Sequence, residues 1–349
     1  MIIARTPYRI SFFGGGSDFP GYYREHGGAV LSTTINRYVY ATCRYLPPFF
    51  AHKSRVVWSK IEVVTEHASL ENPVVRAALD FLGIDRGIEV HYQGDLPARS
   101  GLGSSSSFTV GLLHALHGLQ GHHVSKEQLA HQAIHIERTM LAEPGGVQDQ
   151  IAAAYGGLSR IDFHRDDSFV VTPMMIGAQR MRDLEQHMLL FYTGLSRDAS
   201  SIEREKTSRV GDIQNDLRLI QDMVEEGERL LTSDAPFDAF GALLHEAWTV
   251  KRRLSNKVAP SFIDLIYEKG IKAGASGGKL LGAGGGGFVL FIVSPDRHAA
   301  VLDALQDLLV VPVQIDRRGS QIIFYEPEPH TRTSLIRRDF RAFNLNGGA

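Results

Sequence analysis

A run of glycine and serine at residues 100–107 is the strongest chemical signal in the sequence, and it reads S-G-L-G-S-S-S-S. It lies between a predicted strand and a predicted helix that begins near Ser104. Glycine lets the backbone approach an anion closely, and the first turn of a helix offers unpaired N–H groups with partial positive charge. Both features suit a phosphate group. The alternative is a flexible loop whose serine caps the helix.

This run departs from two common phosphate-binding patterns. A Walker A loop needs Lys and then Ser or Thr after its second glycine, whereas Phe108 ends the serines here. The dinucleotide pattern G-x-G-x-x-G fails as well, because Ser106 stands where the third glycine belongs. The run therefore indicates a phosphate site of another kind.

A second glycine run, G-A-G-G-G-G, covers residues 282–287. It matches G-x-G-x-x-G on paper, but we predict a helix before it and a strand after it, the reverse of the order in a dinucleotide site. The pattern therefore disfavours an NAD-linked oxidoreductase. Ordering successive glycines is entropically costly, so we expect the backbone here to pass close to another group. The alternative is a tight turn on a surface where two domains pack.

Three carboxylates could assist chemistry at a phosphate. Glu137 lies in the apolar stripe of a predicted helix over 125–141, where a carboxylate is unusual unless it is paired or binds a metal. Asp149 lies in the first turn of a predicted short helix, and Asp18 follows the glycine loop F-F-G-G-G-S. The structural alternatives are an edge salt bridge for Glu137, a helix-dipole contact for Asp149 and a turn for Asp18.

Hydrophobic periodicity and turn residues predict the elements that must position these side chains. Strands are predicted over 29–46, 56–64, 88–92, 157–163, 169–173, 188–192, 288–293, 311–315 and 321–325. Helices are predicted over 72–82, 104–117, 125–141, 202–231, 237–254, 260–273 and 297–309. Runs of strands beside runs of helices favour an α+β fold over a doubly wound sheet. The region 175–186 is the predicted domain boundary, and the polar residues after His330 predict a loosely held tail.

The composition excludes several classes of protein. The chain has 349 residues and a net charge of −2, which gives it no overall attraction for nucleic acid or an anionic membrane. Its single cysteine, Cys43, permits no intrachain disulfide and no zinc cage, and this indicates a reducing compartment. We see no signal peptide and no apolar run near the roughly 20 residues that span a bilayer. We expect a cytoplasmic protein without nucleic-acid or membrane partners, and the sequence leaves homo-oligomerisation open.

Three features coincide along the chain: Arg9 before a glycine loop and Asp18, the G-L-G-S-S loop at a helix start, and the late G-A-G-G-G-G loop before a strand. Together they resemble the GHMP small-molecule kinases, which include galactokinases, homoserine kinases, mevalonate kinases and phosphomevalonate kinases. The stretches R-T-P-Y-R-I-S-F-F-G-G-G-S-D-F-P, E-P-G-G-V-Q-D-Q-I-A-A-A-Y-G-G and G-G-K-L-L-G-A-G-G-G-G-F look most like the D-glycero-D-manno-heptose 7-phosphate 1-kinase branch. The last stretch also resembles the kinase part of fucokinases. The galactokinase signature G-E-H-T-D is replaced here by G-G-G-S-D, which argues against galactose as substrate.

The resemblance implies the two-domain architecture of this family. Residues 1–178 would form an N-terminal ATP-binding domain that contains a left-handed βαβ unit. Residues 179–330 would form a ferredoxin-like C-terminal domain, and residues 331–349 a tail. ATP and the substrate would lie between the two domains.

The resemblance also implies roles for individual residues. Asp149 would act as the catalytic base, and Arg9 would stabilise charge on the transferred phosphoryl group. The residues that cradle the ATP phosphates would be Gly101, Gly103, Ser104, Ser105 and Ser106. Ser105 and Glu137 would ligate Mg²⁺. The residues that contact the sugar would be Ser17, Asp18, Gly284, Gly285 and Gly286. Arg197 is a further candidate for its position just after a predicted strand, and the alternative for it is a solvated loop charge.

The implied activity is ATP-dependent phosphorylation of the anomeric hydroxyl of D-glycero-D-manno-heptose 7-phosphate to the 1,7-bisphosphate. The family uses this step in nucleotide-activated heptose synthesis for surface polysaccharide. A sugar that already carries a phosphate needs a second cationic site, for which Arg197 is the first candidate and the cluster 251–253 the second. Two alternatives stay open: a 1-kinase for an unphosphorylated sugar of the fucose or mannose type, and a non-catalytic sugar- or nucleotide-binding protein with the same fold.

Overall fold

The computed structural model describes residues 1–47, 49–195, 200–255 and 258–327. Its larger sheet holds nine strands within these residues, and six of them follow the order β13-β1-β2-β5-β3-β4. Two long strands form its centre, β1 (Ile2–Phe13) and β2 (Gly28–Tyr45), and they pair antiparallel. The remaining strands of this sheet are β3 (Ser54–Val57), β4 (Ile61–Val64), β5 (Ile88–Gly94), β6 (Leu158–Phe163), β7 (Phe169–Pro173), β12 (Ile315–Asp316) and β13 (Gln321–Tyr325).

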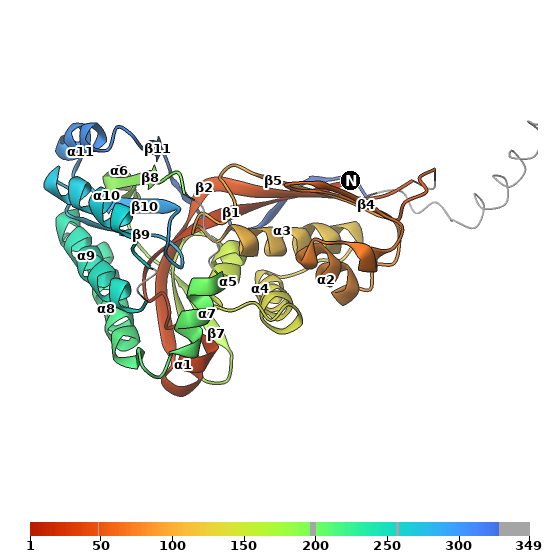
Figure 1. Cartoon of the computed structure of the whole chain (residues 1–349), viewed down its shortest axis with the longest axis horizontal. Helices are drawn as coiled ribbons and strands as arrows, with labels where there is room; N and C mark the ends of the chain where they lie inside the picture. The colour runs from red at the N-terminus through yellow and green to blue at the C-terminus, as the bar shows by residue number, and fades with distance from the viewer. Residues whose placement is uncertain (48, 196–199, 256–257, 328–349) are drawn as a thin grey trace, which may run out of the picture.

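Helices cover one face of this sheet, and α3 lies at their centre (Figure 1). α3 (Ser104–Leu119) is buried along nearly its whole length against β1 and β2. Around it lie α2 (Pro73–Phe81), α4 (Lys126–Ile134) and α5 (Gln148–Tyr155). Side-chain caps define two of the starts: Asn72 accepts from the N–H of Val75 before α2, and Ser125 with Gln128 forms a capping box before α4.

The predicted helix over 125–141 changes its winding before its end. α4 stops at Ile134, and one turn of π-helix follows from His135 to Met140. This wider turn carries Glu137, which is buried. Single π turns inside helices occur often at functional sites, so the position of Glu137 here agrees with its predicted importance.

The smaller sheet has the antiparallel order β11-β8-β10-β9. Its strands are β8 (Met188–Tyr192), β9 (Gly277–Leu280), β10 (Phe288–Ile292) and β11 (Leu309–Val311). If these four strands are numbered by their order in the chain, they lie side by side in the sheet as fourth, first, third and second. Helices follow the first and the third strand. This is the ferredoxin-like arrangement. The predicted ferredoxin-like fold of this part, and the GHMP architecture as a whole, are confirmed.

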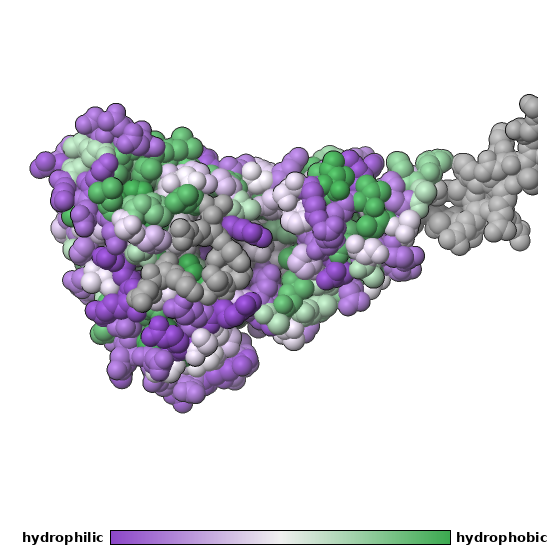
Figure 2. Space-filling view, in the orientation of Figure 1, coloured by the Kyte–Doolittle hydropathy of each residue, from purple (hydrophilic) through white to green (hydrophobic). Residues whose placement is uncertain are grey.

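The helices of the second part gather at the wide end of the molecule (Figure 1). They are α8 (Gln214–Thr232), α9 (Phe237–Arg253), α10 (Ser261–Lys272) and α11 (His298–Ala304). α8 buries Leu217, Ile220 and Val224 on one face. Hydrophilic side chains predominate over the region of α1, α7 and α8 in Figure 2, as expected for helices that turn one face to water.

Several predicted elements need correction. A strand, β9, precedes the glycine run 282–287 where we predicted a helix, and the predicted helix over 202–231 is divided into α7 (Ser200–Ser208) and α8. The sequence prediction also omitted α1 (Pro20–His26) and α6 (Ala178–His187).

The predicted C-terminal domain, 179–330, does not keep all of its strands in one sheet. β12 pairs with β2 and β13 pairs with β1, so the end of the chain returns to the N-terminal sheet. The predicted tail, 331–349, lies outside the described residues. Among the described residues, no helix has the length and apolar character required to cross a membrane.

Aromatic side chains join the two parts of the molecule. Phe12 and Phe13 at the end of β1 each meet the ring of Phe240 on α9 edge to face, with ring centroids 5.3 Å apart in both pairs. Gly227 on α8 packs against the ring of Phe13, since a Cβ atom on this glycine would lie 2.6 Å from that ring. The absence of a side chain at Gly227 therefore lets α8 approach β1.

We expect Gly227→Ala to destabilise the fold. Overpacking of a buried ring costs typically about 1–3 kcal/mol, and the better helix propensity of alanine offsets roughly 1 kcal/mol of this loss. The free energy of unfolding in urea should fall by up to about 2 kcal/mol. Gly211→Ala is the matched control, because a Cβ atom there meets nothing within 4 Å. A Gly227→Ala protein as stable as the control would contradict this packing.

Candidate functional site

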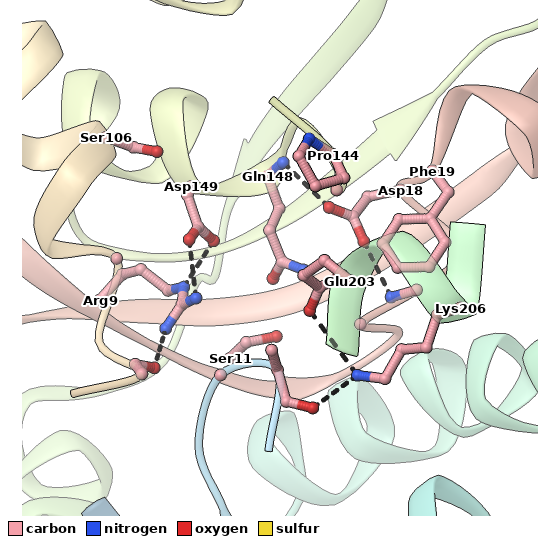
Figure 3. Close-up of a pocket in the computed structure, with 18 of the residues that line it drawn as sticks. Arg9, Ser11, Asp18, Phe19, Ser106, Pro144, Gln148, Asp149, Glu203 and Lys206 are labelled. Carbon is pink, nitrogen blue, oxygen red and sulfur yellow. Dashed lines mark hydrogen bonds and ion pairs between the residues drawn. The ribbon is translucent and has the colours of Figure 1, made fainter. Parts of the chain in front are cut away.

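One pocket contains most of the residues that the sequence analysis singled out. Its walls come from the end of β1, the glycine–serine loop before α3, the start of α5, and the loop after β9 (Figure 3). The pocket thus takes side chains from both sheets. This agrees with the expected position of the ligands between the two parts of the chain.

Arg9 and Asp149 form a bidentate ion pair in this pocket. Arg9 Nε lies 2.7 Å from Asp149 Oδ1, and a terminal nitrogen of Arg9 lies 2.8 Å from Asp149 Oδ2. The other terminal nitrogen donates to the carbonyl of Gly101 at 2.7 Å. Arg9 is 5% exposed, so the pair is largely withdrawn from water. Two residues predicted to act together, 140 positions apart in sequence, are therefore in direct contact.

The glycine–serine loop has the backbone geometry of an anion site. Gly101 and Gly103 have positive φ angles of 83° and 75°, and Gly103 stands immediately before the first turn of α3. These conformations direct the chain into the helix and leave its first N–H groups at the pocket. Ser104, Ser105 and Ser106 all line the pocket, as predicted for a phosphate cradle.

Glu137 lies behind this loop and is 1% exposed. Its Oε1 accepts from Thr109 Oγ1 at 2.6 Å, and its Oε2 accepts from Ser106 Oγ at 2.9 Å and from the side-chain amide of Gln150. Ser105, which was predicted to share a metal with Glu137, is exposed, and the described hydrogen bonds of Glu137 include Ser106 instead. The reason is the helical turn, which directs Ser106 inward and Ser105 to the pocket mouth.

The oxygens around Glu137 suit a hard cation. A carboxylate beside a serine hydroxyl is the kind of donor set that Mg²⁺ accepts with its remaining positions filled by water or phosphate. Glu143, also on the pocket wall, has a pKa raised by burial and by the charge of Glu137. Arg138, whose guanidinium lies 3.6 Å from Glu137 Oε2, balances part of this negative charge and forms the salt bridge that was the structural alternative for Glu137; a bound cation would balance more of it.

Asp18 is buried on the opposite side of the pocket. Its carboxylate accepts from the N–H of Gly16 at 2.8 Å and from the N–H of Gln148 at 3.1 Å. Burial raises the pKa of Asp18, and the two N–H bonds oppose this shift. Gly146 makes the close approach possible, because a Cβ atom there would overlap the Asp18 carboxylate at 1.8 Å.

Ser17, predicted to contact the sugar with Asp18, does not face the pocket. Its side chain is fully buried, and its hydroxyl lies 2.8 Å from the carbonyl oxygens of both Gly14 and Ala29. It therefore holds the turn after β1. Arg197, the predicted partner of the second phosphate, lies outside the described residues.

The late glycine run packs against protein backbone. A Cβ atom on Gly284 would stand 2.6 Å from Val258 Cα, and one on Gly286 would stand 2.9 Å from the carbonyl oxygen of Leu195. Gly285 donates its N–H to the carbonyl of Val258 at 3.0 Å. The pocket wall is formed instead by the start of the run, Gly282 and Ala283. Gly284, Gly285 and Gly286 are not among the residues that line this pocket, and their contact with substrate stays a prediction.

The pocket also holds polar residues that the sequence analysis missed. Gln148 Oε1 and Ser11 Oγ are buried and have no hydrogen-bond partner among the described residues. Lys206 and Glu203 line the pocket as well, although nothing in the local pattern around them indicated a site. Lys279 also lines the pocket, and the available signal was its place in the stretch G-G-K-L-L-G-A-G-G-G-G-F.

Comparisons with known proteins agree with this geometry. The family model for the GHMP kinases N-terminal domain matches residues 71–157, and the model for the GHMP kinases C-terminal domain matches residues 234–310. The D-glycero-alpha-D-manno-heptose 7-phosphate kinase of Campylobacter jejuni is 29% identical over 327 residues, which cover 87% of this chain and 93% of that protein. The bifunctional fucokinase/GDP-fucose pyrophosphorylase of Arabidopsis thaliana is 26% identical, and the match spans 85% of this chain but only 30% of that longer protein.

A solved structure shows the same fold over most of the chain. It is the crystal structure of a D-glycero-D-manno-heptose 1-phosphate kinase from Bacteroides thetaiotaomicron, with a TM-score of 0.76, 24% sequence identity, and coverage of 93% of this chain and 100% of that one. The chain therefore belongs to the GHMP kinase family. It is a sugar kinase of that family.

We expect Gly282→Ala to damage both stability and ATP binding. Gly282 has a φ of +71°, and a Cβ atom there would stand 2.4 Å from Gly101 Cα in the phosphate loop. Backbone strain of this kind costs about 1–3 kcal/mol, and its relief would displace the loop that forms the anion site. Thermal unfolding and ATP titration would measure the two effects. The control is Gly177→Ala, which meets nothing within 4 Å, and equal behaviour of the two variants would contradict the contact.

Proposed function

We propose that this sugar kinase transfers the γ-phosphoryl group of ATP to the anomeric hydroxyl of D-glycero-D-manno-heptose 7-phosphate, with the 1,7-bisphosphate as product. The observation that carries the proposal is the Arg9–Asp149 pair beside the glycine–serine loop. The similarity to the Campylobacter jejuni kinase supports the choice of sugar. The product would enter nucleotide-activated heptose synthesis for surface polysaccharide.

In this proposal the glycine–serine loop binds the ATP phosphates. The N–H groups at the start of α3 and the hydroxyls of Ser104, Ser105 and Ser106 offer donors to phosphate oxygens. Phosphoryl transfer depends mainly on positioning and charge stabilisation, and both can come from a fixed loop of this kind. GHMP kinases use ATP as the phosphate donor, so ATP is the expected nucleotide.

Asp149 accepts the proton of the anomeric hydroxyl as that oxygen attacks the γ-phosphorus. A carboxylate has about four lone-pair sites, so Asp149 can hold Arg9 and still accept from a sugar hydroxyl. An anomeric hydroxyl is more acidic than an ordinary alcohol, which lets a carboxylate serve as base. The attacking oxygen forms a bond to phosphorus while the bond to the β-phosphate oxygen breaks and ADP leaves. Arg9 stabilises the charge that develops on the transferred group.

Glu137, together with Ser105 or Ser106, would hold Mg²⁺. The ion would neutralise charge on the β- and γ-phosphates when it is bound. For Ser105 the support is its place at the pocket mouth, and for Ser106 it is the 2.9 Å hydrogen bond to Glu137. Both hydroxyls start from the same helical turn, so the cation would lie next to the phosphate loop in either arrangement.

The sugar ring occupies the side of the pocket that holds Asp18. Gln148 Oε1 and Ser11 Oγ, unpartnered among the described residues, offer hydrogen bonds to sugar hydroxyls. Asp18 presents a carboxyl group whose orientation is fixed by two backbone N–H groups. A polyhydroxylated substrate would supply the partners that these polar atoms lack.

A second candidate is a 1-kinase for an unphosphorylated sugar such as fucose. The matches to the fucokinase proteins of Arabidopsis thaliana and Bacteroides fragilis, each 26% identical, favour it. It uses the same residues for phosphoryl transfer and differs only in what binds the far end of the sugar. The two candidates are therefore separable by substrate alone.

A coupled ADP-release assay with Mg²⁺ and ATP tests the substrate. We expect kcat/KM for D-glycero-D-manno-heptose 7-phosphate to exceed that for mannose, mannose 6-phosphate, sedoheptulose 7-phosphate, fucose and galactose by at least about tenfold, the effect of roughly 1.4 kcal/mol of selective binding. Preference for fucose or mannose would select the second candidate. No ADP release with any of these sugars would contradict both candidates.

Asp149→Asn tests the proposed base. We expect kcat to fall about 10²- to 10⁴-fold, because the amide cannot accept the proton, while ATP still binds. Asp167→Asn is the matched control, since Asp167 forms a similar pair with Arg24 but is half exposed at the surface. Near-normal turnover by a folded Asp149→Asn protein would remove Asp149 from the mechanism.

A further inference from the structure

Three lysines with buried side chains line the pocket. Lys206, Lys251 and Lys279 are 3%, 9% and 5% exposed, and they come from α7, α9 and β9. Lysine is among the residue types that are almost never fully buried unless they are paired. Three of them at one cavity therefore require an explanation that the phosphoryl-transfer residues do not provide.

The ammonium groups are held mainly by backbone carbonyls. Lys206 donates to Ala283 at 2.6 Å, Lys251 to Leu280 at 2.9 Å and to Gly282, and Lys279 to Phe12 at 2.7 Å. An ammonium group has three N–H donors. The hydrogen bonds given above use one or two of them on each lysine, so each lysine keeps at least one donor for a ligand. The carbonyls fix the positions of the charges without neutralising them.

Ion pairs of the three lysines are few among the described residues, although Glu203 and Asp18 line the same pocket. Among the described residues these lysines form one ion pair, in which Lys206 Nζ lies 3.6 Å from Glu203 Oε1. Burial, with the neighbouring charges of Arg9 and Lys206, lowers the pKa of Lys279 to about 7. Burial and the charges of Lys279 and Lys206 lower the pKa of Lys251 well below its usual range. Burial is the larger cause of both shifts in pKa and the neighbouring cations add to it, so a bound anion would favour the charged forms of these lysines.

Lys206 and the phosphate loop lie on different sides of the pocket (Figure 3), whereas Lys251 donates to Gly282, which packs on Gly101 of the loop. In Figure 3, Ser106 and the Arg9–Asp149 pair lie on one side, while Lys206, Glu203 and Asp18 lie on the other. Lys251 and Lys206 both donate to carbonyls of residues 280–283, so these two ammonium groups approach the same short segment. The pocket thus has two cationic regions, with Arg9 at the reacting centre.

We infer that Lys206, Lys251 and Lys279 bind the phosphate that the sugar already carries, a phosphomonoester dianion at the end of the sugar remote from the attacking hydroxyl. The inference rests on the proposed function and adds the residues that select a phosphorylated sugar. Several ammonium donors around one phosphate make charge-assisted hydrogen bonds, which are about twice as strong as neutral ones. The site is connected to the larger sheet, because Lys279 of β9 donates to the Phe12 carbonyl of β1.

Kinetics with paired substrates test the inference. We would measure kcat/KM of Lys206→Met and Lys279→Met for D-glycero-D-manno-heptose 7-phosphate and for the same heptose without its phosphate. We expect each variant to lose about 10- to 100-fold on the phosphorylated sugar, as for one lost hydrogen bond to a charged group, and much less on the unphosphorylated one. KM for ATP should change by less than about threefold, because the nucleotide binds elsewhere. Arg252→Gln is the control, since Arg252, although part of the candidate cluster 251–253, pairs with Asp264, is 45% exposed and is not among the residues that line the pocket.

Three kinetic results would overturn the inference. Equal losses on both sugars would show a structural role for the lysines, and a raised KM for ATP without a change for the sugar would assign them to the nucleotide. Variants that keep the full preference for the phosphorylated sugar would overturn it as well. If the unmodified protein phosphorylates only unphosphorylated sugars, the proposed substrate fails first, and this is visible before any variant is made.

Binding of inorganic phosphate gives a second readout that does not need turnover. The thermal midpoint of the unmodified protein, measured with a saturating non-hydrolysable ATP analogue, should rise when inorganic phosphate is added. The Lys206→Met/Lys279→Met protein should lose this rise, whereas Arg252→Gln should keep it. An unmodified protein that shows no rise, or a double variant that keeps it, would overturn the inference.

Discussion

The ion pair between Arg9 and Asp149 fixes the relative positions of three separate parts of the chain. Arg9 comes from β1 and Asp149 from the first turn of α5, and Arg9 also donates to Gly101 in the phosphate loop. The N–H of Arg9 adds a hydrogen bond to the carbonyl of Leu102 at 3.0 Å. A guanidinium presents its donors in one plane, so the pair sets orientation as well as distance. Because the arginine is buried, loss of its partner would leave an unpaired charge inside the protein.

The two glycine runs form the second constraint, and they act on each other. A Cβ atom on Gly101 would stand 2.5 Å from the carbonyl oxygen of Leu281, and one on Gly287 would stand 2.2 Å from that of Ser100. The sequence allowed two interpretations of the late glycine run, a close approach of its backbone to another group and a tight packing turn, and both are partly right. It is a packing turn between the two parts of the chain, and the backbone that it approaches so closely is the phosphate loop itself.

Local pattern was sufficient for much of the fold. Asn72 before α2 and the capping box at Ser125 mark helix starts by chemistry that lies within four residues, so the sequence predicted them. β9 was missed because two of its four residues are glycines and one is lysine, which gives no apolar alternation. The return of β12 and β13 to the first sheet depends on partners about 280 to 325 residues away, which no local window contains.

The residues of the candidate site also fall into two groups, those that local sequence predicts and those that depend on distant parts of the chain. Asp149, Asp18 and the serines near α3 lie in motifs, and a motif can be identified from neighbouring residues alone. Ser17 belongs to such a motif too, but whether its hydroxyl faces the pocket or the turn depends on Ala29, twelve residues away. Lys251 belongs to the second candidate cluster, 251–253, but only the folded chain shows that it lines the pocket while Arg252 and Arg253 form ion pairs elsewhere. Lys206 occurs in an ordinary charged stretch of a helix, and only the folded chain reveals that its side chain is buried beside the late glycine run.

The distribution of charge in the pocket follows from these constraints. Two phosphate-bearing ligands in one cavity repel each other, and the low-dielectric interior strengthens that repulsion. Cations attached to rigid backbone reduce it without moving, because the carbonyls of 280–283 and Phe12 hold the ammonium groups before any ligand arrives. The carbonyls of 280–283 belong to the segment that packs on the phosphate loop. A displacement of the late glycine run would therefore alter the lysine cluster and the phosphate loop together, which couples the two ends of the pocket through backbone contacts alone.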